Sequence, residues 1–291
     1  MSPDPVARVR RFNRAVTLEV GALDTSFLGR GRPLGSARVL NVVGRGASDV
    51  AEVRAALGLD SGLMSRLLRG LEEEGLIETL SHPEDARRRV VKLTEAGRGE
   101  FAAYEALSDA QARAMLGRHS RPEVLLAAMD IVASAFGRDR VALEEMDPRS
   151  QEARFCLGEY YAELARRFES GFDVSRSRDP EAEDMIRPRG AFLVAMSDGL
   201  PIGCAGLKAS GNKAAEVKRV WVSPSARGLG LARQLMDAIE SAAQSLGVKI
   251  LRLDTNSALS EALSLYRNSG WIEIDRFNDD PYPDVFFEKR L

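Results

Sequence analysis

The spacing of apolar residues changes at a charged segment, residues 137–153, which contains Pro148. Before this segment, apolar residues recur mostly at the spacing of amphipathic helices, whereas after it β-rich stretches alternate with helical stretches. A chain of 291 residues also exceeds the usual size of one domain. We therefore predict a linker within this segment, a mainly α-helical domain over residues 1–143 and an α/β or α+β domain over residues 144–291.

The charge and the histidine content limit the chemistry of the two parts. The net charge of −2 is close to neutral, so contact with nucleic acid must depend on local basic clusters. The two histidines, His82 and His119, both precede the second part. That part therefore cannot hold a His-dependent catalytic triad or a histidine-ligated metal, and we expect no metal site.

The cysteines and the apolar runs predict the compartment. Cys156 and Cys204 show neither CxxC spacing nor a disulfide framework, which fits a reducing environment. No apolar run approaches the roughly 20 residues needed to cross a membrane, and the N-terminus lacks the features of a secretory signal. We expect a cytoplasmic protein without a membrane partner.

The first part carries the signals of several helices and one β-hairpin. Its first four helices are expected at residues 5–20, 33–44, 48–59 and 60–80. Ser48 is the expected N-cap of the third helix, and Asp60 or Ser61 that of the fourth. Two β-rich stretches around a polar turn with Pro83 and Asp85 predict the hairpin. Helix, turn, helix and hairpin in this order are typical of a winged helix-turn-helix domain.

The fourth helix and the hairpin tip present the side chains expected to contact DNA. On the helix, the polar face opposite the leucine stripe consists of Ser61, Ser65, Arg66 and Arg69. At the tip, Arg87, Arg88 and Arg89 form the sharpest basic cluster in the chain, suited to phosphates or a minor groove. The alternative is that the helix arginines pair with nearby glutamates and that the arginine run is an ordinary polar turn.

Both stretches resemble the MarR family of transcriptional regulators. Residues 60–77, DSGLMSRLLRGLEEEGLI, are similar to its recognition helix, and residues 82–97, HPEDARRRVVKLTEAG, to its wing. The pattern Asp85-x-Arg87 and the KLTEAG exit carry most of the likeness, which spans residues 5–140. The resemblance implies a homodimer built from the terminal helices that binds a pseudo-palindromic operator in double-stranded DNA.

The second part alternates between strands and helices. We expect a helix at 151–170, two strands joined by a turn at Asp198–Gly199, a strand at 216–222, a helix at 228–246, a strand at 249–254, a helix at 258–269, and strands at 271–277 and 285–290.

A Gly-rich turn, residues 227–232, lies between a strand and a helix of this part. It lacks the Lys of a P-loop, and Arg233 stands where a dinucleotide fingerprint needs its third glycine. Small residues at 228, 230 and 232 leave backbone N–H groups bare at a helix N-terminus, and Arg227 adds a charged donor suited to a pyrophosphate. The alternative is a strand-to-helix turn that is only made easier by glycine.

The sequence around this turn resembles the GNAT superfamily of N-acetyltransferases. Residues 216–240, EVKRVWVSPSARGLGLARQLMDAIE, are similar to its cofactor-binding motif, and residues 253–274, LDTNSALSEALSLYRNSGWIEI, to its next strand and helix. The resemblance implies a mixed central sheet that is splayed between strands 216–222 and 249–254, with acetyl-CoA between them. Pantetheine would pair with the backbone near Val220 and Val222. The pyrophosphate would lie on the N–H groups of Gly228, Leu229, Gly230, Leu231 and Ala232.

The resemblance also suggests catalytic residues. Glu216 lies eleven positions before Arg227, where lysine acetyltransferases of the superfamily carry their base, and simple alternation puts it on one strand face with Val220 and Val222. Tyr266 is the candidate general acid, because a phenol is a reasonable proton donor to a leaving thiolate. The alternatives are a Glu216 carboxylate paired with Lys218 or Arg219 and a Tyr266 that belongs only to the core.

One position departs from the superfamily pattern, and the acceptor side is inferred from loops. Many members carry Asn seven residues before the tyrosine, where this chain has Leu259. Asn256 lies nearby and is expected to take over a cofactor or substrate contact. The aromatic residues expected on the acceptor side are Phe172, Tyr282 and Phe286.

The sequence therefore predicts a MarR-like DNA-binding domain fused to an acetyl-CoA-dependent N-acetyltransferase that acts on a primary amine of a small molecule or of a protein lysine. One alternative is a transcriptional regulator whose second domain only senses acetyl-CoA. Another is a first domain that serves dimerisation alone.

Overall fold

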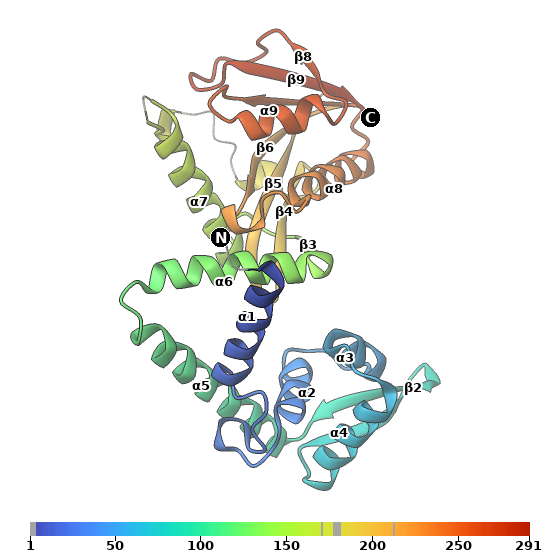
Figure 1. The fold of residues 1–291 in the computed structure, drawn as a ribbon. Coiled ribbons are helices and arrows are strands. Elements are labelled where there is room, and N and C mark those ends of the chain that lie inside the picture. Colours follow the sequence, from blue (N-terminus) through green and yellow to red (C-terminus); the bar gives the residue numbers. More distant parts are fainter. Residues whose placement is uncertain (1–3, 170, 177–181, 212) are drawn as a thin grey trace. The chain divides into compact units, whose positions relative to one another are not determined.

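The computed structural model describes residues 4–169, 171–176, 182–211 and 213–291. The chain divides into two compact units, Met1–Pro122 and Glu123–Leu291, which Figure 1 draws from blue to red. This division lies earlier than the domain boundary expected at 143/144. No helix in the described part of the chain is long and apolar enough to cross a membrane.

The first unit consists of helices and one hairpin. Its elements are α1 (Pro5–Glu19), η1 (Phe27–Gly29), α2 (Leu34–Gly44), α3 (Val50–Leu57), α4 (Ser61–Glu73), β1 (Ile77–His82), β2 (Asp85–Leu93) and α5 (Glu95–Gly117). The strands β1 and β2 pair in antiparallel fashion, as predicted. The helix-helix-hairpin order of the winged helix-turn-helix domain is therefore confirmed.

Short side-chain caps set where these helices begin. Asp60 accepts a hydrogen bond from the N–H of Leu63 at 2.8 Å and caps α4. The expected cap Ser48 of α3 is wrong, because the carboxylate of Asp49 accepts the N–H of Ala51 at 2.7 Å. Helices α2, α3 and α4 then bury one apolar core. Its fully buried large side chains include Val39, Leu40, Val53, Met64 and Leu71.

The second unit is built on a mixed sheet. Its elements are α6 (Pro122–Gly137), η2 (Arg138–Arg140), β3 (Ala142–Glu145), α7 (Gln151–Arg167), η3 (Val174–Arg176), η4 (Ala182–Met185), β4 (Gly190–Ser197), β5 (Leu200–Gly211), β6 (Ala214–Val222), η5 (Pro224–Ala226), α8 (Leu231–Ser245), β7 (Ile250–Thr255), α9 (Ser260–Arg267), β8 (Ile272–Ile274) and β9 (Val285–Arg290). In the described residues the strand order is β3-β4-β5-β6-β7-β9-β8. Only the pair β6–β7 of this described sheet is parallel.

The predicted linker is wrong, because residues 137–153 lie within the second unit and include η2, β3 and the start of α7. Within that segment, β3 pairs with β4 at the edge of the sheet, from Ala142 opposite Met196 to Glu145 opposite Leu193. Charged residues are common on such edge strands, because they discourage pairing with another chain. A charged segment can therefore look like a linker in the sequence.

Helices cover the two faces of this sheet with separate apolar cores. The larger core contains residues of α8 and α9, such as Leu235, Ile239 and Tyr266. On the other face, Ala153 and Cys156 of α7 pack against β4, β5 and β6. Figure 1 shows α7 and α8 as the two long helices beside the sheet. This α/β arrangement with a mixed sheet matches the predicted fold class.

Candidate functional site

The strands β6 and β7 separate along their length. Within the described residues their parallel pairing covers three residue pairs, from Ala214 opposite Ile250 to Glu216 opposite Arg252. Beyond this point the two segments of the chain are called the β6 arm (residues 217–232) and the β7 arm (residues 253–261). The predicted splay of the sheet is thus present.

The Gly-rich turn lies in the β6 arm, and no described side chain covers the backbone at its two glycines. Gly228 and Gly230 have φ angles of +75° and +86°, in the left-handed region that favours glycine. A Cβ atom at either position would meet no atom of the described residues within 4 Å. Gly230 is the N-cap of α8, and no side chain among the described residues caps this helix. The positive end of the helix dipole and its first N–H groups can therefore bind an anion.

The predicted alternation along β6 is wrong, because a β-bulge interrupts it. Cys204 lies opposite Trp221 and Gly206 opposite Lys218, so β6 has one extra residue between these pairs. Arg219 absorbs the irregularity with a φ of +58°. Val217 and Val222 then both reach the core beneath α8, although they differ in parity. Glu216 therefore does not share a face with Val220 and Val222.

A buried lysine links the two arms near the end of their pairing. The Nζ atom of Lys218 lies 2.8 Å from Oδ2 of Asp254 and 3.1 Å from Oε2 of Glu216. Asn278 donates a further hydrogen bond to Asp254 at 2.5 Å. Burial alone would lower the pKa of Lys218, but the two carboxylates outweigh it and raise that pKa. The structure thus contains the ion pair of Glu216 with Lys218. The sequence had offered this pair as the alternative to a Glu216 that acts as catalytic base.

The candidate acid Tyr266 lies in the core between α9 and the sheet. It is 5% exposed, and its ring centroid lies 5.6 Å from that of Phe287 and 6.0 Å from that of Trp271. Burial raises the pKa of Tyr266 well above its ordinary value of 10, and the proximity of Tyr160 and Asp254 raises it further. The phenol is protonated at neutral pH, as a proton donor must be, and its raised pKa makes it a weaker acid than an ordinary tyrosine.

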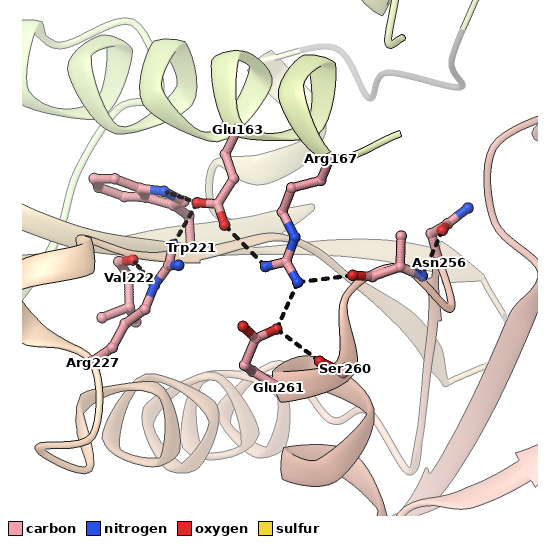
Figure 2. A network of polar contacts seen from close by, with 9 residues as sticks. Glu163, Arg167, Trp221, Val222, Arg227, Asn256, Ser260 and Glu261 are labelled. Atoms are coloured by element: carbon pink, nitrogen blue, oxygen red, sulfur yellow. Dashed lines mark hydrogen bonds and ion pairs between the residues drawn. The ribbon is translucent and has the colours of Figure 1, made fainter. Parts of the chain in front are cut away.

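Arg227 has protein partners on two sides. Its Nε donates to the carbonyl of Val222 at 3.1 Å, and its Nη2 lies 2.5 Å from Oε2 of Glu163 in α7. The same oxygen of Glu163 accepts a hydrogen bond from Nε1 of Trp221 at 3.1 Å. Figure 2 shows these contacts converging on Glu163. The guanidinium predicted to bind a pyrophosphate therefore also shapes the turn that precedes α8.

Asn256 is engaged at the exit of β7. Its Nδ2 donates to the carbonyl of Tyr282 at 2.7 Å, and its Oδ1 accepts the N–H of Ala258 at 2.9 Å. The side chain that was expected to contact a cofactor or substrate thus fastens the loop before β9 to the β7 arm.

The aromatic residues expected on the acceptor side fall into two groups. Phe172 and Tyr282 have ring centroids 4.7 Å apart, and the hydroxyl of Tyr282 accepts the N–H of Asp173 at 2.9 Å. Phe286 instead lies edge-on to Phe277, with centroids 5.5 Å apart. Phe172 and Tyr282 therefore form one surface with neighbouring aromatic residues of α7, and Phe286 is not part of it.

In the first unit, the predicted DNA contacts are exposed on α4 and on the wing. Ser61, Ser65, Arg66 and Arg69 are exposed, whereas Met64, Leu68 and Leu71 of the same helix are buried. In the described part of the chain no ion pair involves Arg66, Arg69, Arg87 or Arg89. Arg88 differs, because its guanidinium lies 2.7 Å from Oδ2 of Asp49. That contact holds the pKa of the Asp49 carboxyl below its usual value.

Sequence reasoning missed several residues of this site. Glu163, Arg167 and Tyr160 of α7, together with Asp254, are polar residues placed by tertiary contacts. A Glu and an Arg four residues apart on a helix usually read as a solvated pair, although Glu163 is 9% exposed. Among the described residues no group of His, Cys, Asp and Glu is arranged to hold a metal ion.

Comparisons with known proteins match both units. The model of the acetyltransferase (GNAT) family matches residues 157–271, and that of the MarR family matches residues 30–88. The chain is 34% identical over 116 residues to an IAA acetyltransferase of Azospirillum brasilense, covering 38% of this chain and 74% of the relative. It is 31% identical over 126 residues to an uncharacterized N-acetyltransferase of Schizosaccharomyces pombe, covering 41% and 77%. A solved GNAT acetyltransferase of Staphylococcus aureus is 18% identical, with a TM-score of 0.46, and covers 52% of this chain and 98% of that chain.

Proposed function

The chain belongs to the GNAT family of acetyltransferases, with a MarR-family domain ahead of it, and from this membership we propose that it transfers the acetyl group of acetyl-CoA to a primary amine. The observation that carries the proposal is the separation of β6 from β7 beside the uncapped N-terminus of α8. The backbone groups of the two strands beyond their pairing would bind an extended thioester, and the helix end would bind its phosphates.

The Gly-rich turn fits the pyrophosphate of the acetyl donor. The backbone N–H groups from Gly228 to Ala232 would bind its oxygens, since the left-handed glycines expose them. Arg227 would support this site chiefly by holding the shape of the turn through Val222 and Glu163. The backbone of Val220 and Val222, beyond the pairing with β7, would bind pantetheine.

Two side chains would manage the protons of the reaction. As the amine nitrogen bonds to the acetyl carbon, Glu216 would accept the proton that the amine loses. As the bond from that carbon to sulfur breaks, Tyr266 would donate its phenolic proton to the sulfur. Glu216 lies on the sheet face opposite α8, from which an acceptor amine would approach, and its bond to Lys218 would hold it in place.

The experiment that tests this proposal incubates the chain with acetyl-CoA and a panel of small amines and lysine peptides. Mass spectrometry of the amines should reveal an acetylated product. If acetyl-CoA binds, no amine is acetylated and binding changes the affinity for DNA, then the second unit is a sensor and the proposed transfer is wrong.

We further propose that the first unit binds operator DNA as a homodimer. Exposed polar residues of α4 and the wing residues Arg87 and Arg89 support the DNA contact. The exposed apolar residues of α1 support a partner helix, since Val6, Val9 and Phe12 are 63%, 58% and 41% exposed. Light scattering should give twice the mass of one chain. A monomer that still binds the DNA upstream of its own coding sequence would contradict the proposed dimer.

A further inference from the structure

Side chains of α7 connect the two arms where backbone pairing has ended. The register of β6 with β7 stops at Glu216 and Arg252, so the distance between the arms beyond that point depends on other contacts. Lys218 and Asp254 make one such contact close to the paired end. Farther out, α7 lies across both arms, and two of its side chains reach down to them, as Figure 2 shows.

Glu163 holds the β6 arm. Its Oε2 accepts Nε1 of Trp221 at 3.1 Å and Nη2 of Arg227 at 2.5 Å. Arg227 in turn bonds the carbonyl of Val222 at 3.1 Å, which ties the end of β6 to the start of the Gly-rich turn. The Glu163 side chain is only 12% exposed, so water and salt reach its carboxylate less than they reach the 37% exposed side chain of Arg227.

Arg167, one helical turn after Glu163, holds the β7 arm. Its Nη2 lies 2.8 Å from the carbonyl oxygen of Ala258 and 2.8 Å from Oε2 of Glu261 at the start of α9. Its Nη1 lies 3.2 Å from Oε1 of Glu163. The two oxygens of one carboxylate thus serve the two arms, one directly and the other through Arg167.

The charges along this connection alternate. Arg227, Glu163, Arg167 and Glu261 form a series of cation, anion, cation and anion, in which each neighbour satisfies the next. Neutralising Glu163 would leave two guanidinium groups close together without their shared anion. The β6 arm would lose its ion pair with α7, and the Gly-rich turn would lose one of the two contacts that fix Arg227.

We propose that Glu163 and Arg167 are positioning residues that fix the separation of the two arms and thereby set the affinity for acetyl-CoA. Neither residue is proposed to take part in the acetyl transfer itself. The inference rests on the proposed function, because the arms are where acetyl-CoA is proposed to bind. Through these two side chains, α7 holds the Gly-rich turn in its binding conformation in the absence of acetyl-CoA, so that binding does not have to order the turn.

The test is the affinity of purified full-length chains for acetyl-CoA, measured by calorimetry. Glu163→Gln should raise the Kd at least about fivefold, the lower end of usual couplings between sites. Glu159→Gln is the matched control. Glu159 is exposed and lies one turn earlier on α7, and its substitution removes the same charge as Glu163→Gln. Its Kd should equal that of the wild type. In acetylation assays, KM for acetyl-CoA should rise with the Kd, while kcat falls far less.

The outcomes separate this inference from the proposed function. If the wild type does not bind acetyl-CoA, the proposed function fails. If the wild type binds and Glu163→Gln binds equally well or more tightly, the positioning role is wrong. Should Glu163→Gln not fold, Arg167→Gln replaces it, since that side chain is 26% exposed and its loss removes the bonds to Ala258 and Glu261 that hold the β7 arm. An unchanged Kd in Arg167→Gln would then overturn the role of Arg167.

Discussion

Two glycines at the ends of α8 provide a matched test of the proposed phosphate site. Gly228 precedes the helix and Gly247 follows it, and both have a φ of +75°. At either position a Cβ atom would meet no described atom within 4 Å. Alanine should therefore cost only backbone strain at each, about 1–2 kcal/mol. For a unit of this size that strain lowers the Tm by roughly 2–4 °C per kcal/mol.

The two variants should differ in acetyl-CoA binding. At Gly228, strain in the left-handed turn would turn N–H groups away from the pyrophosphate. The loss of one charge-assisted hydrogen bond costs about 1.5–3 kcal/mol, which corresponds to roughly a ten- to hundredfold rise in Kd. At Gly247, the helix end proposed to bind phosphate is unchanged, so the Kd should equal that of the wild type.

Calorimetry with acetyl-CoA and thermal unfolding of the same samples separate the two effects. We expect similar losses of Tm in both variants and a weaker affinity only in Gly228→Ala. Equal affinities in the two variants would refute the assignment of the pyrophosphate to the Gly-rich turn.

Three further changes test other parts of the account. Tyr266→Phe should lower kcat about a hundredfold without changing the Kd for acetyl-CoA, because it removes a proton donor; an unchanged kcat in a thiol-release assay would exclude Tyr266 as the acid. Replacing Arg87 and Arg89 by Ala should reduce the salt dependence of DNA binding by about 0.9 unit of slope per lost phosphate contact, whereas Arg88→Ala, which breaks the ion pair with Asp49, should mainly lower the Tm. Glu100 bonds Arg30 at 2.6 Å, which lowers the pKa of its carboxyl, so its contribution to stability is present above pH 4.5 and lost as the pH falls further. In urea titrations Glu100→Gln should therefore unfold more easily at pH 7 than the wild type by about 1.5–3 kcal/mol, with a difference that shrinks in acid; a constant difference would contradict this.

Local signals account for most of the elements that the sequence predicted. The periodicity of α4, its cap Asp60 and the left-handed Gly75 after it are read directly from the residues. The turn at Asp198–Gly199 likewise joins β4 to β5, with both residues in the left-handed region. Such features depend on neighbours in the sequence, so the sequence alone suffices for them.

Tertiary contacts decide the features that the sequence did not predict. The bulge places Arg219, a non-glycine residue, at positive φ, and its neighbours stabilise this conformation: the guanidinium carbon lies 5.1 Å from the ring centroid of Tyr161. Simple alternation does not predict this bulge. Because of the bulge, Glu216 lies on the opposite face of the sheet from Val220 and Val222. Glu163 is buried only because Trp221 and Arg227 come to it from a distant strand and turn.

We propose that acetyl-CoA binds between the arms of β6 and β7 with its pyrophosphate on the Gly-rich turn. Hydrogen–deuterium exchange of the full-length chain, with and without saturating acetyl-CoA, tests it most directly. The amides from Gly228 to Ala232 should exchange more slowly when acetyl-CoA is present, because they donate to its pyrophosphate. Unchanged exchange at these amides, under conditions where calorimetry shows that acetyl-CoA is bound, would contradict it.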